Sequence, residues 1–95
     1  ILDEAKRLVN GDRQNTYGNP LDNHSTTSEF WNSYVKRKYK ISLSLTAEDV
    51  CWFNVLQKIS RECNIPKRDN SVDICGYVTN VEMVREEINR RKQTL

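Results

Sequence analysis

The chain has 95 residues, of which 29% are charged and 37% hydrophobic, and its 15 basic and 13 acidic side chains give a formal net charge of +2. This length is enough for one domain, residues 1–95, and leaves no room for a second. No apolar run approaches the roughly 20 residues of a membrane-spanning helix, and the small net charge argues against nucleic acid as a partner.

Apolar residues recur at helical spacing near the start of the chain, and a glycine follows them as a stop. They are Leu2, Ala5, Leu8 and Val9, followed by Gly11. This pattern predicts a first helix over residues 1 to 10. Residues 12 to 19 have no hydrophobic period and many turn formers, so they are expected to form the longest loop.

The second helix is predicted for residues 20–39. Asn19 is suited to cap free backbone N–H groups, and Pro20 is tolerated at the first helical position. The expected inner face follows a period near 3.6 and consists of His24, Thr27, Trp31, Tyr34, Val35 and Lys38. A cluster of basic residues, within residues 36–40, lies at the end of this helix. It either complements the helix macrodipole or contacts nucleic acid, with Tyr39 as a stacking surface.

Thr46 and Asp49 resemble a capping box and predict the start of a third helix. Pro66 ends this helix, because proline disfavours the helical conformation in the residue before it. The predicted apolar stripe of the third helix is Trp52, Val55, Leu56, Ile59 and Cys63.

A fourth helix is predicted from about residue 70 to residue 92. Its main stripe is Ile74, Tyr77, Val81, Val84 and Ile88, and a second face of small residues is Val72, Gly76, Thr79 and Met83. Two buried faces in so short a chain indicate a central position in the bundle or pairing with a second copy. We therefore predict an all-α, four-helix bundle-like single domain and expect a homo-oligomer.

The acids at the start of the fourth helix are the first candidates for chemistry. Asp69 and Asp73 are one helical turn apart, and oxygen ligands from successive turns suit a hard cation such as Mg²⁺. Glu48 and Asp49 would complete an acidic metal site if the two helices bring their N-terminal ends together. In the structural alternative Asp69 caps its helix, Asp49 completes the capping box, and Asp73 pairs with Lys58 or Arg61.

Phosphate and base contacts have their own candidates. Lys58 and Arg61, three residues apart, could project together and bind phosphate groups, and the alternative is a solvated face. In the long loop, Arg13 offers a further phosphate contact and Tyr17 a platform for a base, while tight turns draw on the same residue types.

The cysteines and the histidine are expected to have structural roles. Cys51, Cys63 and Cys75 match neither a CxxC metal hook nor the even count of a disulfide framework, so we expect reduced thiols in an intracellular protein. His24 is expected as a hydrogen-bonded imidazole at the core edge, since no nucleophile pairs with it.

Several segments, in this order and spacing, resemble a family of small bacteriophage and prophage proteins of unknown function. They are Leu8 to Arg13, Tyr17 to Pro20, Asn23-His24, Trp31, Leu45 to Val50, Lys58 to Arg61 and Asp69 to Tyr77. The resemblance covers residues 8 to 80 and implies a protein of the host cytoplasm, with no membrane contact.

A remoter similarity links Asp69 and the segment Asp73 to Tyr77 with the MazG-like all-α nucleoside triphosphate pyrophosphohydrolases. That resemblance implies a four-helix assembly that oligomerises and binds Mg²⁺ through two acidic pairs. The chain departs from the pattern, because the preceding helices lack a Glu-x-x-Glu pair and Asp69 and Asp73 are spaced i, i+4 instead of i, i+3.

Two functional hypotheses follow. In the first, the protein is a magnesium-dependent nucleotide pyrophosphohydrolase with Asp69 and Asp73 as catalytic residues and metal ligands. In the second, it is a non-enzymatic phage accessory protein that uses the same cations to bind a nucleotide or a host macromolecule. The departure from the Glu-x-x-Glu pattern favours the second.

Overall fold

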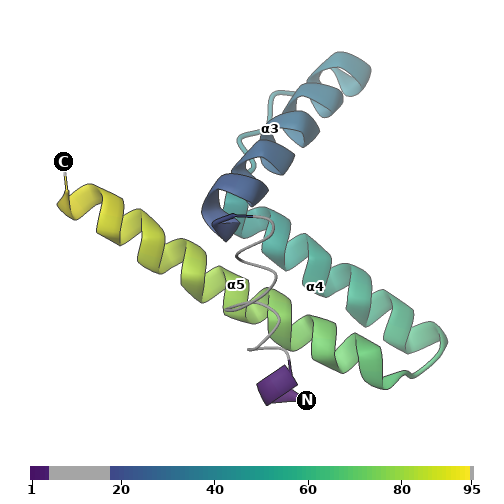
Figure 1. The fold of residues 1–95 in the computed structure, drawn as a ribbon. Coiled ribbons are helices and arrows are strands. Elements are labelled where there is room, and N and C mark those ends of the chain that lie inside the picture. The colour runs from purple at the N-terminus through teal and green to yellow at the C-terminus, as the bar shows by residue number, and fades with distance from the viewer. Residues whose placement is uncertain (5–17, 95) are drawn as a thin grey trace.

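The computed structural model describes residues 1–4 and 18–94 (Figure 1). The three long helices are α3, Pro20–Tyr39, α4, Ala47–Asn64, and α5, Arg68–Gln93. Residues 2–4 are also helical, and no strand occurs in the described part of the chain. The prediction of an all-α domain is confirmed, while most of the predicted first helix and of the loop after it lies outside the described residues.

The α4 and α5 helices form an antiparallel hairpin, and α3 packs near the N-terminal end of α4 and leans away from the hairpin (Figure 1). The core of this arrangement contains Ala47 and Cys51 from α4 with Val81 and Val84 from α5, and Leu21 of α3 packs against it. The small Ala47 and Cys51 side chains allow α4 and α5 to approach closely. The described helices therefore form a hairpin with a third helix across its end.

The α3 helix begins and ends where the sequence predicts. The Asn19 side chain accepts a hydrogen bond from the Leu21 N–H at 2.8 Å, and Pro20 occupies the first helical position. At the other end Lys40 has a φ of 60°, and its N–H donates to the Lys36 carbonyl at 3.0 Å. This left-handed residue turns the chain back along α3.

The segment after α3 is held in place by one amide side chain. The Asn32 Nδ2 donates to the Leu45 carbonyl at 3.1 Å, and its Oδ1 accepts from the Leu45 N–H at 3.0 Å. The next residue, Thr46, forms the predicted capping box with Asp49, whose carboxylate accepts from the Thr46 N–H at 2.9 Å. The start of α4 is thus fixed both by its own cap and by α3.

The start of α5 differs from the prediction. The helix begins at Arg68 after Lys67, which makes no side-chain capping hydrogen bond, so Asp69 lies in the first turn and does not cap the helix. Instead Glu62, from the last turns of α4, accepts hydrogen bonds from the Lys67 N–H and the Asn70 Nδ2, both at 3.0 Å. Asn70 is buried, so this contact locks the α4–α5 turn.

The predicted apolar stripe of α4 is wrong except for Val55. The structure buries Ala47, Val50, Cys51 and Val55, whereas Leu56 is 59% exposed. Trp52, Ile59 and Cys63 also lie at the surface. The periodic pattern of large apolar residues predicted the wrong face of α4, because the helix turns its small residues toward α5.

The α5 helix follows the prediction more closely. Val81 and Val84 of the main stripe are fully buried, and Val72 of the second face is buried as well. On α3 the predicted inner face holds for half-buried Trp31, whose ring centroid lies 5.7 Å from that of Phe53, but Tyr34 is exposed.

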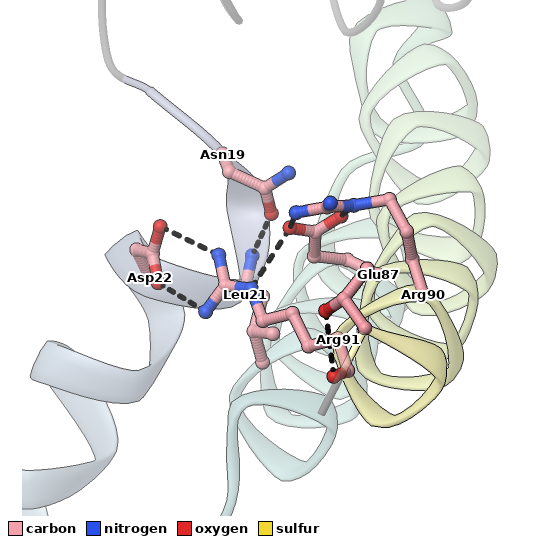
Figure 2. A network of polar contacts seen from close by, with 7 residues as sticks. Asn19, Leu21, Asp22, Glu87, Arg90 and Arg91 are labelled. Carbon is pink, nitrogen blue, oxygen red and sulfur yellow. Dashed lines mark hydrogen bonds and ion pairs between the residues drawn. The ribbon is translucent and has the colours of Figure 1, made fainter.

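An ion-pair network joins the start of α3 to the end of α5 (Figure 2). Arg91 donates to both oxygens of Asp22, at 2.9 and 3.0 Å, and to Glu87 at 2.8 Å. Arg90 donates to Glu87 at 2.6 and 2.7 Å. Hydrogen bonds from Arg90 and Arg91 lower the pKa of Glu87 to about 2.

Truncation of Val84 tests the position of the core. We expect Val84→Ala to lower the free energy of unfolding by about 2 kcal/mol, because two buried methyl groups are lost and a cavity remains. Val78→Ala, the same change at a residue of α5 that is 40% exposed, should change it by less than about 0.5 kcal/mol. Urea unfolding followed by circular dichroism measures both, and equal losses would contradict this core.

The depressed pKa of Glu87 predicts a dependence of stability on acid. Ionised Glu87 stabilises the fold fully above its unfolded pKa near 4.5, and this contribution is lost as the pH falls through about 2. Between pH 4.5 and 2 the wild-type melting temperature should therefore fall more steeply than that of Glu87→Gln. Parallel pH profiles would contradict the network, and Glu86→Gln serves as an exposed control on the same helix.

Candidate functional site

The turn between α4 and α5 encloses a hollow of about 340 Å³, which we call the α4–α5 hollow. Its lining residues are Lys58, Arg61, Asn64, Ile65, Lys67, Asp69, Asn70 and Asp73. Four of the predicted site residues therefore lie together, namely Lys58, Arg61, Asp69 and Asp73. The antiparallel hairpin explains this, since it places the last turns of α4 beside the first turns of α5.

Lys58 and Asp73 form an ion pair across the hairpin, with 2.8 Å between Nζ and Oδ2. The Lys58 side chain is only 14% exposed, whereas that of Asp73 is 41% exposed. The pairing with Lys58 is one of the two that the structural alternative predicts for Asp73. It also orients the ammonium group of Lys58 at the hollow.

Three other charged groups of the hollow lack such partners. Within residues 1–4 and 18–94, no ion pair or side-chain hydrogen bond engages the charged groups of Arg61, Lys67 or Asp69. With Lys58, the lining holds three cations against two carboxylates. The free cations are therefore in excess over the free carboxylate.

The backbone adds to the positive potential of the hollow. The first turn of α5 has no side-chain cap, and the unpaired N–H groups at the start of a helix attract anions. Glu62 fixes this turn, and hydrogen bonds from Asn70 and the Lys67 N–H lower the pKa of its carboxyl group. The sequence analysis missed Glu62, Lys67 and Asn70. Pro66 marks the turn, but nothing local indicates that Glu62 reaches across it.

The second predicted acidic pair lies at the other end of α4. Glu48 accepts from Arg85 at 2.8 and 3.0 Å and from the Trp52 Nε1 at 3.1 Å, and both donors lower its pKa. Asp49 is engaged in the capping box. Arg85 and Asp73 are twelve residues apart on one helix, which corresponds to about 18 Å.

The four predicted metal ligands therefore do not share one site within a single copy. No group of three or more His, Cys, Asp or Glu side chains suited to a metal ion occurs among the residues that the structure describes. The reason is the antiparallel packing, which places Asp69 and Asp73 beside the end of α4 and Glu48 and Asp49 at its start.

Other predicted residues have separate outcomes. Arg13 and Tyr17 lie outside the described residues. His24 is half-buried, with its Nε2 3.5 Å from the Asn80 Nδ2, as expected for an imidazole at the core edge. Cys51 is fully buried, and this burial raises the pKa of its thiol to about 11, which makes it a poor nucleophile.

Two further predictions concern the oxidation state of the cysteines and the absence of a membrane-spanning helix. Cys51, Cys63 and Cys75 are all free thiols, although Cys63 is exposed and does not pack in the core. None of the described helices combines the length and the hydropathy needed to cross a lipid bilayer.

Comparison with known proteins confirms the predicted phage family and lends no support to the MazG-like resemblance. The chain is 34% identical over 86 residues to the Gene 55 protein of Mycobacterium phage L5, covering 90% of the chain and 52% of that protein. It is 32% identical over 88 residues to the Gene 55 protein of Mycobacterium phage D29, covering 92% of the chain and 54% of that protein.

The chain thus spans about half the length of these curated relatives. No solved structure matches it. The model of a domain of unknown function, DUF6378, matches residues 1–85. Because this match covers most of the sequence, the chain belongs to the DUF6378 family.

Proposed function

We propose that this phage domain binds the phosphate groups of a nucleotide in the α4–α5 hollow and does not hydrolyse them. The observation that supports this proposal is the excess of cations in the hollow, where Arg61 and Lys67 have no carboxylate partner among the described residues. Two unpaired cations beside an uncapped helix start form a favourable environment for a phosphate group.

Each of the three cations in the lining has a distinct part in this binding. Arg61 supplies a guanidinium fork for two phosphate oxygens, and Lys67 supplies a mobile point charge. Lys58 is held by Asp73 and contributes a fixed positive charge at the wall. The first N–H groups of α5, which no side chain caps, can donate to the remaining phosphate oxygen.

The arrangement of acids favours binding over turnover. Lys58 neutralises Asp73. Glu48 and Asp49, at the other end of α4, are engaged by Arg85 and by the capping box. Protein-bound Mg²⁺ is commonly held by one or two carboxylates together with substrate phosphates. Asp69 offers one such carboxylate, so magnesium would enter as the counter-ion of the nucleotide and neutralise its phosphate charge.

The predicted self-association is part of the proposal and has its own support. Trp52, Leu56 and Ile59 on α4 are 39%, 59% and 45% exposed. At 100° per residue these side chains fall on one flank of the helix. Exposed apolar patches of this kind are typical of protein interfaces.

Loss of Arg61 tests the phosphate contact. We expect Arg61→Gln to weaken nucleoside triphosphate binding roughly tenfold or more, because a charge-assisted hydrogen bond is removed. Isothermal titration calorimetry in magnesium-containing buffer measures the dissociation constant. Lys92→Gln, which also removes an exposed positive charge near the end of α5, is the matched control. An equal loss in the Lys92 variant would contradict binding in the α4–α5 hollow.

Asp73→Asn separates binding from catalysis. If the protein binds nucleotides without hydrolysis, Asp73→Asn should keep or slightly increase the affinity for nucleoside triphosphates. The reason is that the variant removes a carboxylate from the hollow and frees Lys58. A pyrophosphate-release assay with a panel of nucleoside triphosphates should show no turnover in either protein. Release by the wild type that Asp73→Asn abolishes would overturn the proposal in favour of a hydrolase, and Glu86→Gln is the control for acid removal.

A further inference from the structure

The far end of α3 and the segment that returns from it enclose a second hollow, of about 790 Å³. Its lining residues are Ser33, Lys36, Arg37, Lys40 and Ser42. We call it the α3 hollow. It contains three cations and two hydroxyl groups and no carboxylate. The end of α3 points away from the α4–α5 turn (Figure 1), and the two hollows share no lining residue.

The backbone gives this hollow a fixed shape. Lys40 adopts the left-handed conformation and reverses the chain, and Asn32 holds Leu45 through two hydrogen bonds. The segment between them is therefore tied to α3 at both ends, with Ser42 on the wall of the hollow. The Lys40 ammonium group folds back onto the Arg37 carbonyl at 2.8 Å, which keeps its charge close to the helix end.

The cations here are not neutralised within the described part of the chain. None of Lys36, Arg37, Lys38 and Lys40 has a carboxylate within ion-pair distance there, whereas Arg85, Arg90 and Arg91 all do. The negative end of the helix dipole accounts for some of this charge. Four unpaired cations in five residues nevertheless produce a local positive field that an external polyanion would relieve.

Aromatic rings lie beside these cations. The Lys38 Nζ is 5.6 Å from the ring centroid of Tyr34 and 5.5 Å from that of Tyr39, and it donates to the Tyr34 hydroxyl at 3.1 Å. Lys38 thereby restrains both rings, although they remain 58% and 57% exposed. Exposed, restrained rings beside unpaired cations are the elements that stack unpaired bases and hold a phosphate backbone.

We propose that this end of α3 binds single-stranded nucleic acid. Backbone phosphates occupy the α3 hollow on Lys36, Arg37 and Lys40, with hydroxyl donors from Ser33 and Ser42, and bases stack on Tyr34 and Tyr39. The tyrosines favour a single strand over a duplex, because paired bases are not free to stack on them. The net charge of +2 concealed this surface, since the acids that balance the cations lie elsewhere.

Fluorescence anisotropy with a labelled single-stranded oligothymidylate tests this proposal in the intact protein. For Lys36→Gln/Arg37→Gln we expect weaker binding and a salt dependence, log K against log salt, that is shallower by about 1.4, since each phosphate contact contributes about 0.7. Tyr39→Ala should weaken binding at least about fivefold through lost stacking. Lys92→Gln, at an exposed position near the end of α5 and outside both hollows, should leave the affinity unchanged.

Two control ligands complete the experiment. A duplex of the same length and vesicles containing phosphatidylglycerol present phosphates without unpaired bases. Weaker binding to both, together with the Tyr39→Ala effect, supports the proposal. Equal binding to duplex or vesicles that Tyr39→Ala does not alter would overturn it, as would an unchanged salt dependence in the double variant. Because the two hollows share no lining residue, failure here leaves the proposed nucleotide site untouched.

Discussion

The close antiparallel contact of α4 and α5 determines the rest of the described structure. Fully buried Val81 and Val84 pack against Ala47 and Cys51, and the small size of these two α4 residues lets the helices approach closely. This packing sets which residues of α4 face which residues of α5. The ion pairs of Glu48 with Arg85 and of Lys58 with Asp73 form within that alignment.

One consequence is the separation of the acids into two groups. Glu48 meets Arg85 near the start of α4, whereas Lys58 meets Asp73 near its end. Glu48 and Asp73 thus each have a cation from the opposite helix. The same packing leaves Arg61 and Lys67 around the α4–α5 turn without a described carboxylate partner, so the lining of the hollow holds three cations against two aspartates.

Both apolar and polar contacts position α3. Leu21 packs against the core and Trp31 contacts Phe53, while Asp22 pairs with Arg91 and the Asn32 amide binds the Leu45 backbone. Isolated exposed ion pairs contribute little stability. A helix held in this way keeps most of its far end in solvent, where its cations and tyrosines stay accessible.

The sequence by itself determined the features that depend on local hydrogen bonding and on strong periodicity. Asn19 with Pro20, and Thr46 with Asp49, act on backbone groups a few residues away, so their spacing alone identified the starts of α3 and α4. The burial of Val81 and Val84 followed from their helical period.

Only the tertiary structure decided which face of α4 is buried and how the turn before α5 is closed. Trp52 and Leu56 form a convincing apolar stripe, yet the helix turns Ala47 and Cys51 toward α5, because close packing depends on the fit of both surfaces. The sequence offered Lys58 and Arg61 as alternative partners for Asp73, and the register of the hairpin selected Lys58. Glu62 reaches across the turn to Lys67 and Asn70 through a contact that no local pattern encodes.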